Sequence, residues 1–242
     1  MKGSIHVSAV EMREDVPKDT YLYDLPVVRH LSKKGKLELK KPVTFLVGEN
    51  GIGKSTLIEG IAVCMGFNAE GGTLNFNFST CDSHSDLYKY LTVWKTPNRI
   101  KDGFFLRAES FYNVASYVDE VDVAKYYGGK SLHDQSHGES FLALMENRFL
   151  GNGIYILDEP EAALSPNRLM RLIVLINELV KRNSQFIIST HSPILMSLPC
   201  ADVYQLSQDG IDLVSYQETE HFQLTKAFIN APDKMLGYLL SD

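Results

Sequence analysis

The chain has 242 residues, which suits one large α/β domain or two small ones. With 44% hydrophobic and 22% charged residues it has a globular composition, and no apolar run approaches the roughly 20 residues of a membrane span. The net charge of −6 argues against a general affinity for nucleic acid, although a local basic patch is compatible with it. Three scattered cysteines without a C-x-x-C motif, and an N-terminus unlike a signal peptide, favour a reduced cytoplasmic setting.

The N-terminal part predicts short strands around an irregular lead-in. Residues 4–10 alternate enough for an opening strand, and residues 37–40 alternate like an edge strand. Between them, residues 16–29 are rich in Pro, Asp and Tyr and predict irregular structure that leads into a basic turn. A lysine cluster begins at this turn and is either a solvated surface or a site of DNA contact: Lys33, Lys34, Lys36, Lys40 and Lys41.

A complete phosphate-binding motif follows a predicted buried strand at residues 43–47. The G-x-x-x-x-G-K-[ST] pattern comes next, and apolar residues with helical spacing come after it. In this context backbone N–H groups and the positive end of the helix converge on phosphate, so the motif predicts binding of a nucleoside triphosphate. Lys54 is expected to reach the β- and γ-phosphates, and Ser55 to hold Mg²⁺. The predicted nucleotide-binding residues are Gly48, Glu49, Asn50, Gly51, Ile52, Gly53, Lys54, Ser55 and Thr56.

The insertion after the phosphate helix is too long for a crossover connection and must hold its own subdomain. It includes an alternating segment at 73–78 and a short buried-strand candidate at 104–106. Residues 109–150 predict mostly helix, interrupted by a loop at 127–130. Within the helical part, Ser136-His137-Gly138-Glu139 forms a capping box, with Ser136 at the N-cap and Glu139 at N3. This segment is either an ordinary helix start or an exposed anion site at a helix N-terminus.

The two catalytic candidates lie where later strands end. The apolar strand predicted at 154–157 runs into Asp158, expected to hold Mg²⁺, and Glu159, expected to orient and polarise the attacking water. The strand at 186–189 ends just before His191, and in open α/β sheets ligands bind at such strand ends. His191 is therefore predicted to contact the γ-phosphate, the alternative being a hydrogen-bonded structural histidine.

The remaining segments complete an alternation of strands and helices. Ser165-Pro166 starts a helix with a favoured N-cap and N1 pair, and a short helix follows the strand at 186–189. A turn of Ser-Gln-Asp-Gly joins strands at 203–206 and 211–215, and residues 222–240 predict one or two helices. Alternation after a phosphate loop predicts a mostly parallel sheet.

Taken in order, these segments resemble the Walker A, signature, Walker B, D-loop and H-switch motifs of an ATP-binding-cassette (ABC) ATPase. The resemblance is closest to a group of small bacterial predicted ATPases of the AAA family, related to the heads of RecF and SMC-type proteins. It covers nearly the whole chain and rests on Gly48–Thr56, Ser136–Glu139, Asp158-Glu159, Ala163-Leu164-Ser165 and Thr190-His191-Ser192.

The resemblance implies a P-loop α/β domain of ABC type, with a mostly parallel central sheet, an antiparallel β arm and a helical insertion subdomain. It also implies a head-to-tail homodimer that sandwiches two ATP molecules. The signature residues Ser136, His137, Gly138 and Glu139 would then act in trans, with Ser136 and Gly138 touching the γ-phosphate. A single domain, 1–242, would comprise a nucleotide core (about 41–66 and 150–215), a β arm (about 1–40 and 67–103), a signature subdomain (about 107–149) and C-terminal helices (220–242).

Several positions depart from the transporter pattern. Transporter cassettes usually carry Leu-Ser-Gly-Gly-Gln, whereas here the second position is His137 and the last is Glu139. The Q-loop glutamine is missing, and Glu109 stands at about its place. The sustained heptads of an SMC arm are absent from the sequence as well. Candidates for stacking on the adenine are Tyr21, Tyr23, Arg29 and His30.

The expected function is ATP binding and hydrolysis with Mg²⁺, by a soluble RecF/SMC-like head that dimerises on ATP and acts with DNA, a nuclease or a defence partner. One alternative is the nucleotide-binding subunit of an ABC transporter, bound to a membrane permease. Another is a P-loop small-molecule kinase, which Glu159 disfavours because hydrolysis needs a water-activating base whereas a kinase site excludes water.

Overall fold

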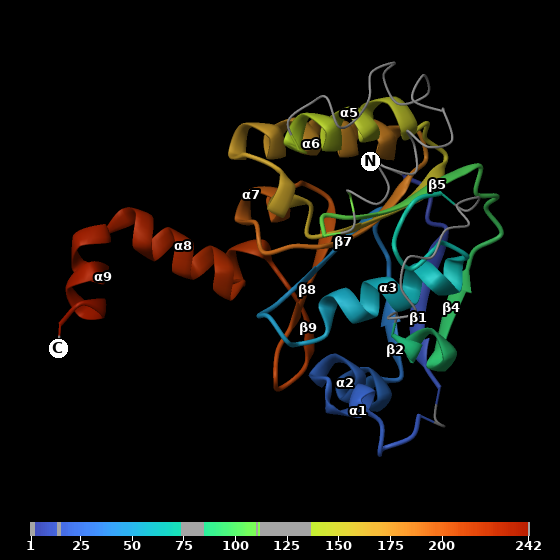
Figure 1. Ribbon diagram of the computed structural model, residues 1–242, viewed down its shortest axis with the longest axis horizontal. Helices are drawn as coiled ribbons and strands as arrows, with labels where there is room; N and C mark the ends of the chain where they lie inside the picture. The colour runs from blue at the N-terminus through green and yellow to red at the C-terminus, as the bar shows by residue number, and fades with distance from the viewer. Residues whose placement is uncertain (1–2, 14–15, 74–84, 110, 112–136, 242) are drawn as a thin grey trace.

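The computed structural model describes residues 3–13, 16–73, 85–109, 111 and 137–241. Its centre is a six-stranded sheet in the order β5-β6-β7-β3-β8-β9 (Figure 1), in which β9 pairs antiparallel and the others run parallel. A second, antiparallel sheet has the order β2-β1-β4. The strands are β1 (Val7–Met12), β2 (Lys36–Glu38), β3 (Val43–Val47), β4 (Leu91–Lys95), β5 (Asp102–Arg107), β6 (Gly153–Asp158), β7 (Gln185–Ser189), β8 (Ala201–Leu206) and β9 (Ile211–Val214).

The central strands are apolar throughout because both faces of the sheet are covered. Every residue of β3, β6 and β7 is buried. Since side chains alternate between faces, Phe45 and Tyr155 join one core while Leu46 and Ile156 join the other. The mostly parallel sheet and the separate antiparallel sheet confirm the predicted α/β fold class.

The helices form a layer on each face of the central sheet (Figure 1). One face packs against α5 (His137–Arg148), α6 (Pro166–Lys181) and α7 (Pro193–Met196). The other face packs against α3 (Lys54–Met65), α2 (Pro26–Lys34) and the antiparallel sheet. The helix α6 begins at Pro166 after Ser165 as predicted, although the Ser165 side chain makes no cap hydrogen bond.

The prediction of an irregular lead-in at 16–29 is wrong. The chain there forms a short helix, α1 (Tyr21–Asp24), followed by α2, which has Pro26 at its first turn. Val27, Val28 and Leu31 of α2 are buried, so tertiary packing decides the helix despite the turn-rich composition. The predicted basic turn is the last turn of α2, where lysines interact favourably with the helix dipole.

A buried glutamine joins the antiparallel sheet to the central one. The Gln185 side chain is fully buried at the start of β7. Its Oε1 accepts from the backbone N–H groups of His6 (2.7 Å) and Val7 (2.8 Å), and its Nε2 donates to the carbonyl of Val7 at 2.8 Å. The amide therefore satisfies three backbone groups at the start of β1 and holds that strand against the core.

The C-terminal segment leaves the body of the molecule. As predicted for 222–240 it is helical, with α8 (Glu220–Asn230) and α9 (Pro232–Leu239) projecting away from the sheet (Figure 1). None of the described helices has the length and apolar character needed to cross a membrane. Three predictions lie outside the described residues: nearly all of the alternating segment at 73–78, the loop at 127–130, and the N-cap Ser136.

Candidate nucleotide site

Three strand ends bring the predicted site residues to one edge of the sheet. β7 lies between β6 and β3, and all three run parallel, so their carboxyl ends share that edge. The glycine loop follows β3, Asp158 ends β6 with Glu159 after it, and His191 comes just past β7. This edge is where open α/β sheets bind ligands.

The glycine loop is clamped between β8 and α2. Gly48 has a φ of +150°, and a Cβ there would lie 2.2 Å from the carbonyl oxygen of Leu206 on β8. Gly53 has a φ of +99°, and its Cβ would lie 2.6 Å from Val27 on α2. The N–H of Val27 also donates to the carbonyl of Ile52 at 3.1 Å. Glycine is required at both positions, and the absent side chains leave room for a phosphate group to approach the backbone.

Lys54 is directed back into this loop from the first position of α3. Its side chain is buried, and Nζ donates to the carbonyls of Gly48 (2.7 Å) and Glu49 (3.0 Å). Burial lowers the pKa of Lys54, while the carboxylates of Glu159 and Asp158 act in the opposite direction. The ammonium group is thus placed inside a loop whose N–H groups and glycines suit phosphate, and its contact with the β- and γ-phosphates stays a prediction.

Asp158 and Ser55, the predicted ligands of a magnesium ion, lie within hydrogen-bond distance of each other. Asp158 is buried at the end of β6; its Oδ1 accepts from Ser189 Oγ at 2.5 Å, and the Ser55 hydroxyl also donates to this carboxylate. Burial raises the pKa of Asp158, against the effects of the Ser189 and Ser55 hydroxyls and of Arg107. In the part of the chain that is described, no group of three or more His, Cys, Asp or Glu gathers as a metal cage. A hydroxyl with one carboxylate suits Mg²⁺, which usually takes few protein ligands and completes its shell with water and phosphate.

A cavity of about 180 Å³ opens beside these oxygens. Glu109, at the Q-loop place, lies on its wall with the side chain 86% exposed, and Arg107 Nη2 is 3.5 Å away. The cavity is lined by Ser55, Ala108, Glu109, Asp158, Glu159 and Ala162. Three segments that are far apart in the sequence therefore meet around one small cavity.

The two catalytic candidates contact each other. His191 Nε2 lies 3.1 Å from Glu159 Oε1. Glu159 has left-handed backbone geometry, with φ of 48°, and its N–H donates to both the carbonyl (3.2 Å) and the hydroxyl (3.1 Å) of Ser189. A non-glycine residue rarely adopts this conformation, so the turn that directs Glu159 is held by its hydrogen bonds to β7.

Sequence reasoning assigned no role to three further residues around the site. Arg107 at the end of β5 joins Glu59 (2.6 Å) to Asp158 (3.5 Å). Glu161 accepts from Thr190 Oγ1 at 2.8 Å and from the N–H of His191, and burial raises the pKa of Glu161. Glu161 lies only three residues after Asp158 in the sequence, which was a usable signal, whereas no local pattern links Arg107 to Asp158.

The third such residue is His221. Its Nε2 lies 2.8 Å from Nδ1 of His191. It belongs to α8, and no local pattern in the sequence links it to His191.

The described part of the signature segment packs against the D-loop of its own chain. A Cβ on Gly138 would lie 2.7 Å from the carbonyl oxygen of Ala163 and 2.6 Å from Arg168 Nη1. Arg168 Nη2 also forms an ion pair with Glu139 at 3.1 Å. The expected action of the signature in trans stays a prediction, as does the capping box, because Ser136 lies outside the described residues.

The residues predicted as candidates for stacking on adenine differ in exposure and in their partners. Tyr21 is 61% exposed, with its hydroxyl donating to Ser85 Oγ at 3.2 Å, whereas Tyr23 packs against the core. A ring nitrogen of His30 lies 2.7 Å from the carbonyl oxygen of Gln208, in the turn between β8 and β9. Which residue stacks on a base stays a prediction.

Four of the five lysines of the cluster contact separate partners. Lys40 pairs with Glu38 at 2.6 Å, and Lys41 with Asp202 at 2.9 Å. Lys36 lies over the ring of Trp94, and Lys34 donates to the carbonyl of Ile211. A DNA-binding patch needs several free cations on one face, so these partners favour the solvated-surface interpretation.

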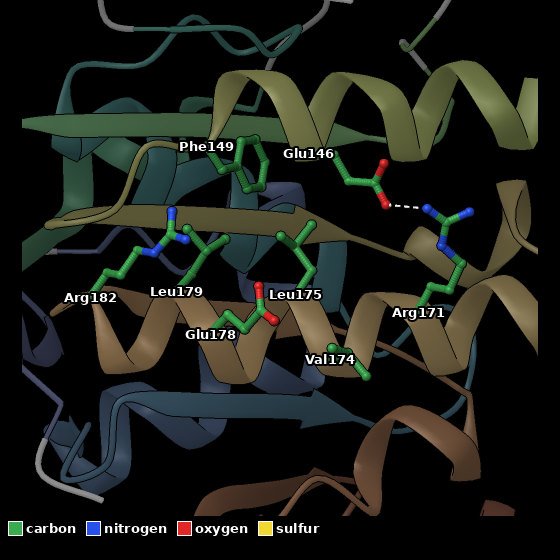
Figure 2. Close-up of a pocket in the computed structure, with 8 residues that line it drawn as sticks. All are labelled: Glu146, Phe149, Arg171, Val174, Leu175, Glu178, Leu179 and Arg182. Atoms are coloured by element: carbon green, nitrogen blue, oxygen red, sulfur yellow. Dashed lines mark hydrogen bonds and ion pairs between the residues drawn. The ribbon is translucent and has the colours of Figure 1, made fainter.

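A larger cavity, of about 430 Å³, lies between α5 and α6 (Figure 2). Arg171 crosses from α6 to Glu146 on α5 at 2.6 Å. Two other lining residues, Phe149 and Arg182, come just before the amino ends of β6 and β7. The cavity is therefore towards the opposite edge of the sheet from the glycine loop, and it is not the nucleotide site.

Two family models match parts of the chain. The model described as "AAA domain, putative AbiEii toxin, Type IV TA system" matches residues 136–197, and one described as "AAA domain" matches residues 28–102. A curated relative, the flagellar biosynthesis protein FlhF of Borreliella burgdorferi, is 33% identical over 86 residues, 35% of this chain and 21% of that protein. The chain thus spans about a fifth of the length of the curated relative that it matches.

Solved structures share the fold over most of the chain. "An inward-facing conformation of a putative metal-chelate type ABC transporter" has a TM-score of 0.51 and 12% identity, covering 93% of this chain and 90% of that chain. CbiO1 of Clostridium perfringens, part of the ABC transporter complex CbiONQ, has a TM-score of 0.50 and 19% identity, covering 97% and 99%. The SMC head domain of Thermotoga maritima has a TM-score of 0.46 and 16% identity, covering 87% and 99%. Family models and fold together confirm the resemblance to ABC-type ATPases.

Proposed function

We propose that this chain, which has the fold of ABC-type P-loop ATPases, binds ATP with Mg²⁺ at the carboxyl edge of its central sheet and hydrolyses it. One observation carries the proposal. Lys54, after β3, and the adjacent pair Asp158 and Glu159, at the end of β6, come from separate segments and meet beside the glycine loop, at the ends of strands that share one edge. Such a convergence suits phosphoryl transfer, where catalysis is mostly positioning and electrostatic stabilisation.

Each residue has a distinct part in this proposal. The glycine loop and Lys54 bind the phosphates, and Ser55 and Asp158 hold Mg²⁺, which neutralises phosphate charge when bound. Glu159 accepts the proton of the attacking water, because its carboxylate lines the cavity beside Asp158. His191 orients Glu159 through their 3.1 Å contact and is proposed to reach the γ-phosphate. Glu109, exposed on the same wall, is proposed to contact the metal shell through water.

We further propose a head-to-tail homodimer that forms on ATP, with Ser136 and Gly138 of each chain completing the site of its partner. The resemblance to cassette ATPases supports this arrangement.

The protein is proposed to be located in the cytoplasm. The thiols of Cys64 and Cys200 are free, which fits a reducing compartment.

The partner is proposed to be a nucleic acid or a defence component. The family description that names a toxin of a type IV toxin–antitoxin system supports a defence setting. The transporter role is less favoured, because the transporter structures are at most 19% identical and thus indicate fold alone. The paired lysines of the basic cluster argue against DNA contact at that place.

Two substitutions test the ATPase proposal. Lys54→Ala is expected to lose nucleotide binding and hydrolysis together, whereas Glu159→Gln is expected to bind Mg-ATP and hydrolyse it at least roughly 100-fold more slowly, as for a lost general base. Binding is measured with a fluorescent ATP analogue and turnover by phosphate release. Lys234→Ala, at an exposed lysine of α9, controls for the loss of a positive charge. Hydrolysis by Lys54→Ala at the wild-type rate would show that the site is assigned wrongly.

The same Glu159→Gln protein tests the assembly. Because it retains ATP, it is expected to accumulate as an ATP-bound dimer, which light scattering resolves from the monomer. A purely monomeric protein at high concentration with Mg-ATP would contradict dimerisation on ATP.

A further inference from the structure

A second histidine engages the ring of His191 from a different part of the chain. His191 Nδ1 lies 2.8 Å from His221 Nε2, and the two rings meet edge to face, with centroids 4.8 Å apart and planes at 62°. His221 lies in the first turn of α8, whose N-cap is Thr219. Because the other ring nitrogen of His191 faces Glu159, two polar contacts link Glu159, His191 and His221 in a row.

The protons of this row can be assigned from what each atom is able to donate. An ionised carboxylate only accepts, so the contact with Glu159 requires a proton on His191 Nε2. In a neutral imidazole the other nitrogen then carries a lone pair, so His191 Nδ1 is an acceptor. The proton between the rings consequently belongs to His221 Nε2. Burial, followed by the nearby His191 and Lys54, lowers the pKa of His221, which agrees with a neutral ring carrying a single proton.

We propose that His221 is a positioning residue that holds His191 in its Nε2–H tautomer by donating a hydrogen bond to His191 Nδ1. The inference rests on the proposed function, since it concerns the residue expected to meet the γ-phosphate. In the other tautomer, a lone pair on Nε2 would face the Glu159 carboxylate and the phosphate oxygens, and both contacts would be repulsive. In functional histidines, a hydrogen bond to one ring nitrogen commonly decides which nitrogen carries the proton and fixes the orientation of the ring.

The backbone and the ring of His191 are held by different parts of the molecule. Glu161, in the turn after β6, accepts from the backbone N–H of His191 and from Thr190 Oγ1. The ring contacts Glu159 through Nε2 and α8 through Nδ1, and α8 projects from the body and has no buried residue (Figure 1). The N–H of Glu220 anchors the start of α8 through a 3.3 Å hydrogen bond to Gln205 Oε1 on β8. The tautomer of His191 therefore depends on where the start of α8 lies as well as on Glu159.

Nitrogen NMR of the full chain, labelled with ¹⁵N-histidine and free of nucleotide, reads the tautomer directly. At a pH above the ordinary pKa of histidine, wild-type His191 is expected to show a protonated Nε2 and an unprotonated Nδ1. His221→Leu removes the donor, so both tautomers of His191 should become populated. His221→Gln is expected to preserve the single tautomer, because the amide nitrogen of glutamine can donate in place of Nε2.

Turnover gives an independent measure of the same effect. In His221→Leu the kcat for ATP is expected to fall roughly 10- to 100-fold, the range for losing a partner that orients a catalytic ligand, with little change in KM. His221→Gln should recover most of the lost kcat. Leu224→Ala, at an exposed position of the same helix, should match the wild type and so exclude a general effect of altering α8.

Two outcomes would overturn the inference. One is a proton on Nδ1 of wild-type His191, in a neutral or a doubly protonated ring. The other is a folded His221→Leu protein whose His191 keeps the single Nε2–H tautomer, whatever its kcat. Because the spectra are recorded without nucleotide, they test the inference even if the wild type hydrolyses no ATP. An absence of ATP hydrolysis would contradict the proposed function and not this inference.

Discussion

At the scale of single residues, the candidate site holds charges that its own burial disfavours. Burial raises the pKa of Asp158 and of Glu161, and it lowers the pKa of Lys54. For each group burial favours the uncharged form. Keeping these groups charged therefore lowers the free energy of unfolding of the chain without ligand. Groups perturbed by burial together with specific charge partners are typical of functional sites. A charged ligand that pairs with them recovers part of that free energy.

Asp158→Asn tests this cost through its pH dependence. The folded pKa of Asp158 lies above its ordinary value of 3.8, so its contribution to the free energy of unfolding is fully present below 3.8 and is lost as pH rises through the folded pKa. Asparagine carries no charge and keeps an oxygen for the Ser189 hydroxyl. In nucleotide-free protein, the stability of Asp158→Asn relative to the wild type should therefore increase as pH rises through this window.

Urea denaturation at a series of pH values measures this difference. Asp209→Asn, in the exposed turn between β8 and β9, controls for the removal of a surface carboxylate. A relative stability of Asp158→Asn that decreases with rising pH would contradict the prediction. The same variant should bind Mg-ATP more weakly, since it lacks the proposed metal ligand.

At the scale of elements, the glycine loop owes its shape to its neighbours. β8 approaches Gly48 from one side, and α2 approaches Gly53 from the other. The two contacting elements are far from the loop in the sequence, and α2 lies in a segment whose composition predicted irregular structure. The phosphate loop is thus a local motif held in place by long-range packing.

Gly48→Ala is expected to destabilise the protein and weaken nucleotide binding together. Its Cβ would lie 2.2 Å from the Leu206 carbonyl, and φ is in the region that side chains rarely adopt. Backbone strain of this kind costs about 1–3 kcal/mol. Gly237→Ala is the matched control: a Cβ there meets nothing within 4 Å, and the change within α9 should stabilise by up to about 1 kcal/mol.

Urea denaturation and nucleotide titration of both variants measure these effects. If Gly48→Ala were as stable as the wild type, the loop would not be clamped against β8. If it were destabilised but bound ATP normally, the close approach of Gly48 would matter for folding and not for phosphate.

At the scale of the whole molecule, the signature segment and the phosphate loop belong to different neighbourhoods of one chain. The atoms nearest to a Cβ on Gly138 belong to Ala163 and Arg168, not to the loop at Gly48–Gly53. A signature that contacts its own D-loop is compatible with the proposed dimer, in which the partner supplies the second wall of each ATP site.

Mixing two inactive variants tests whether each site is built from two chains. Lys54→Ala and Ser136→Arg are each expected to be inactive as homodimers, the second because its bulk and lost cap block the trans contact. In a mixed dimer both lesions can fall on one composite site, which leaves the other site intact. Partial ATPase activity should therefore return on mixing, as measured by phosphate release at equal concentrations.

Each variant measured alone at the same total concentration is the control for this experiment. Full activity of Ser136→Arg alone would show that Ser136 to Glu139 are only a helix start. A lack of recovery in verified mixed dimers would contradict the composite site, unless both sites must act together, which a single-turnover measurement on the mixed dimer decides.

The sequence by itself determined the parts of this protein whose signals are local. The spacing of the glycines, with Lys54 and Ser55 after them, predicts the phosphate loop. This signal is local because only glycine readily adopts the backbone conformations that the loop requires. Continuous apolar runs mark β3, β6 and β7, since strands buried on both faces have no polar side to alternate with. Asp158, Glu159 and His191 were predicted from their places at the ends of these strands, and the structure brings them to one edge of the sheet, while their roles stay predictions.

Only the tertiary structure decided which distant residues meet. It formed α1 and α2 in a segment of turn-rich composition, because burial of Val27, Val28 and Leu31 outweighs local propensity. It set Arg107 between Glu59 and Asp158, and His221 against His191, thirty residues apart in the sequence. No periodicity or motif encodes such pairs, since a contact across the fold depends on how whole elements pack and not on the residues beside each partner.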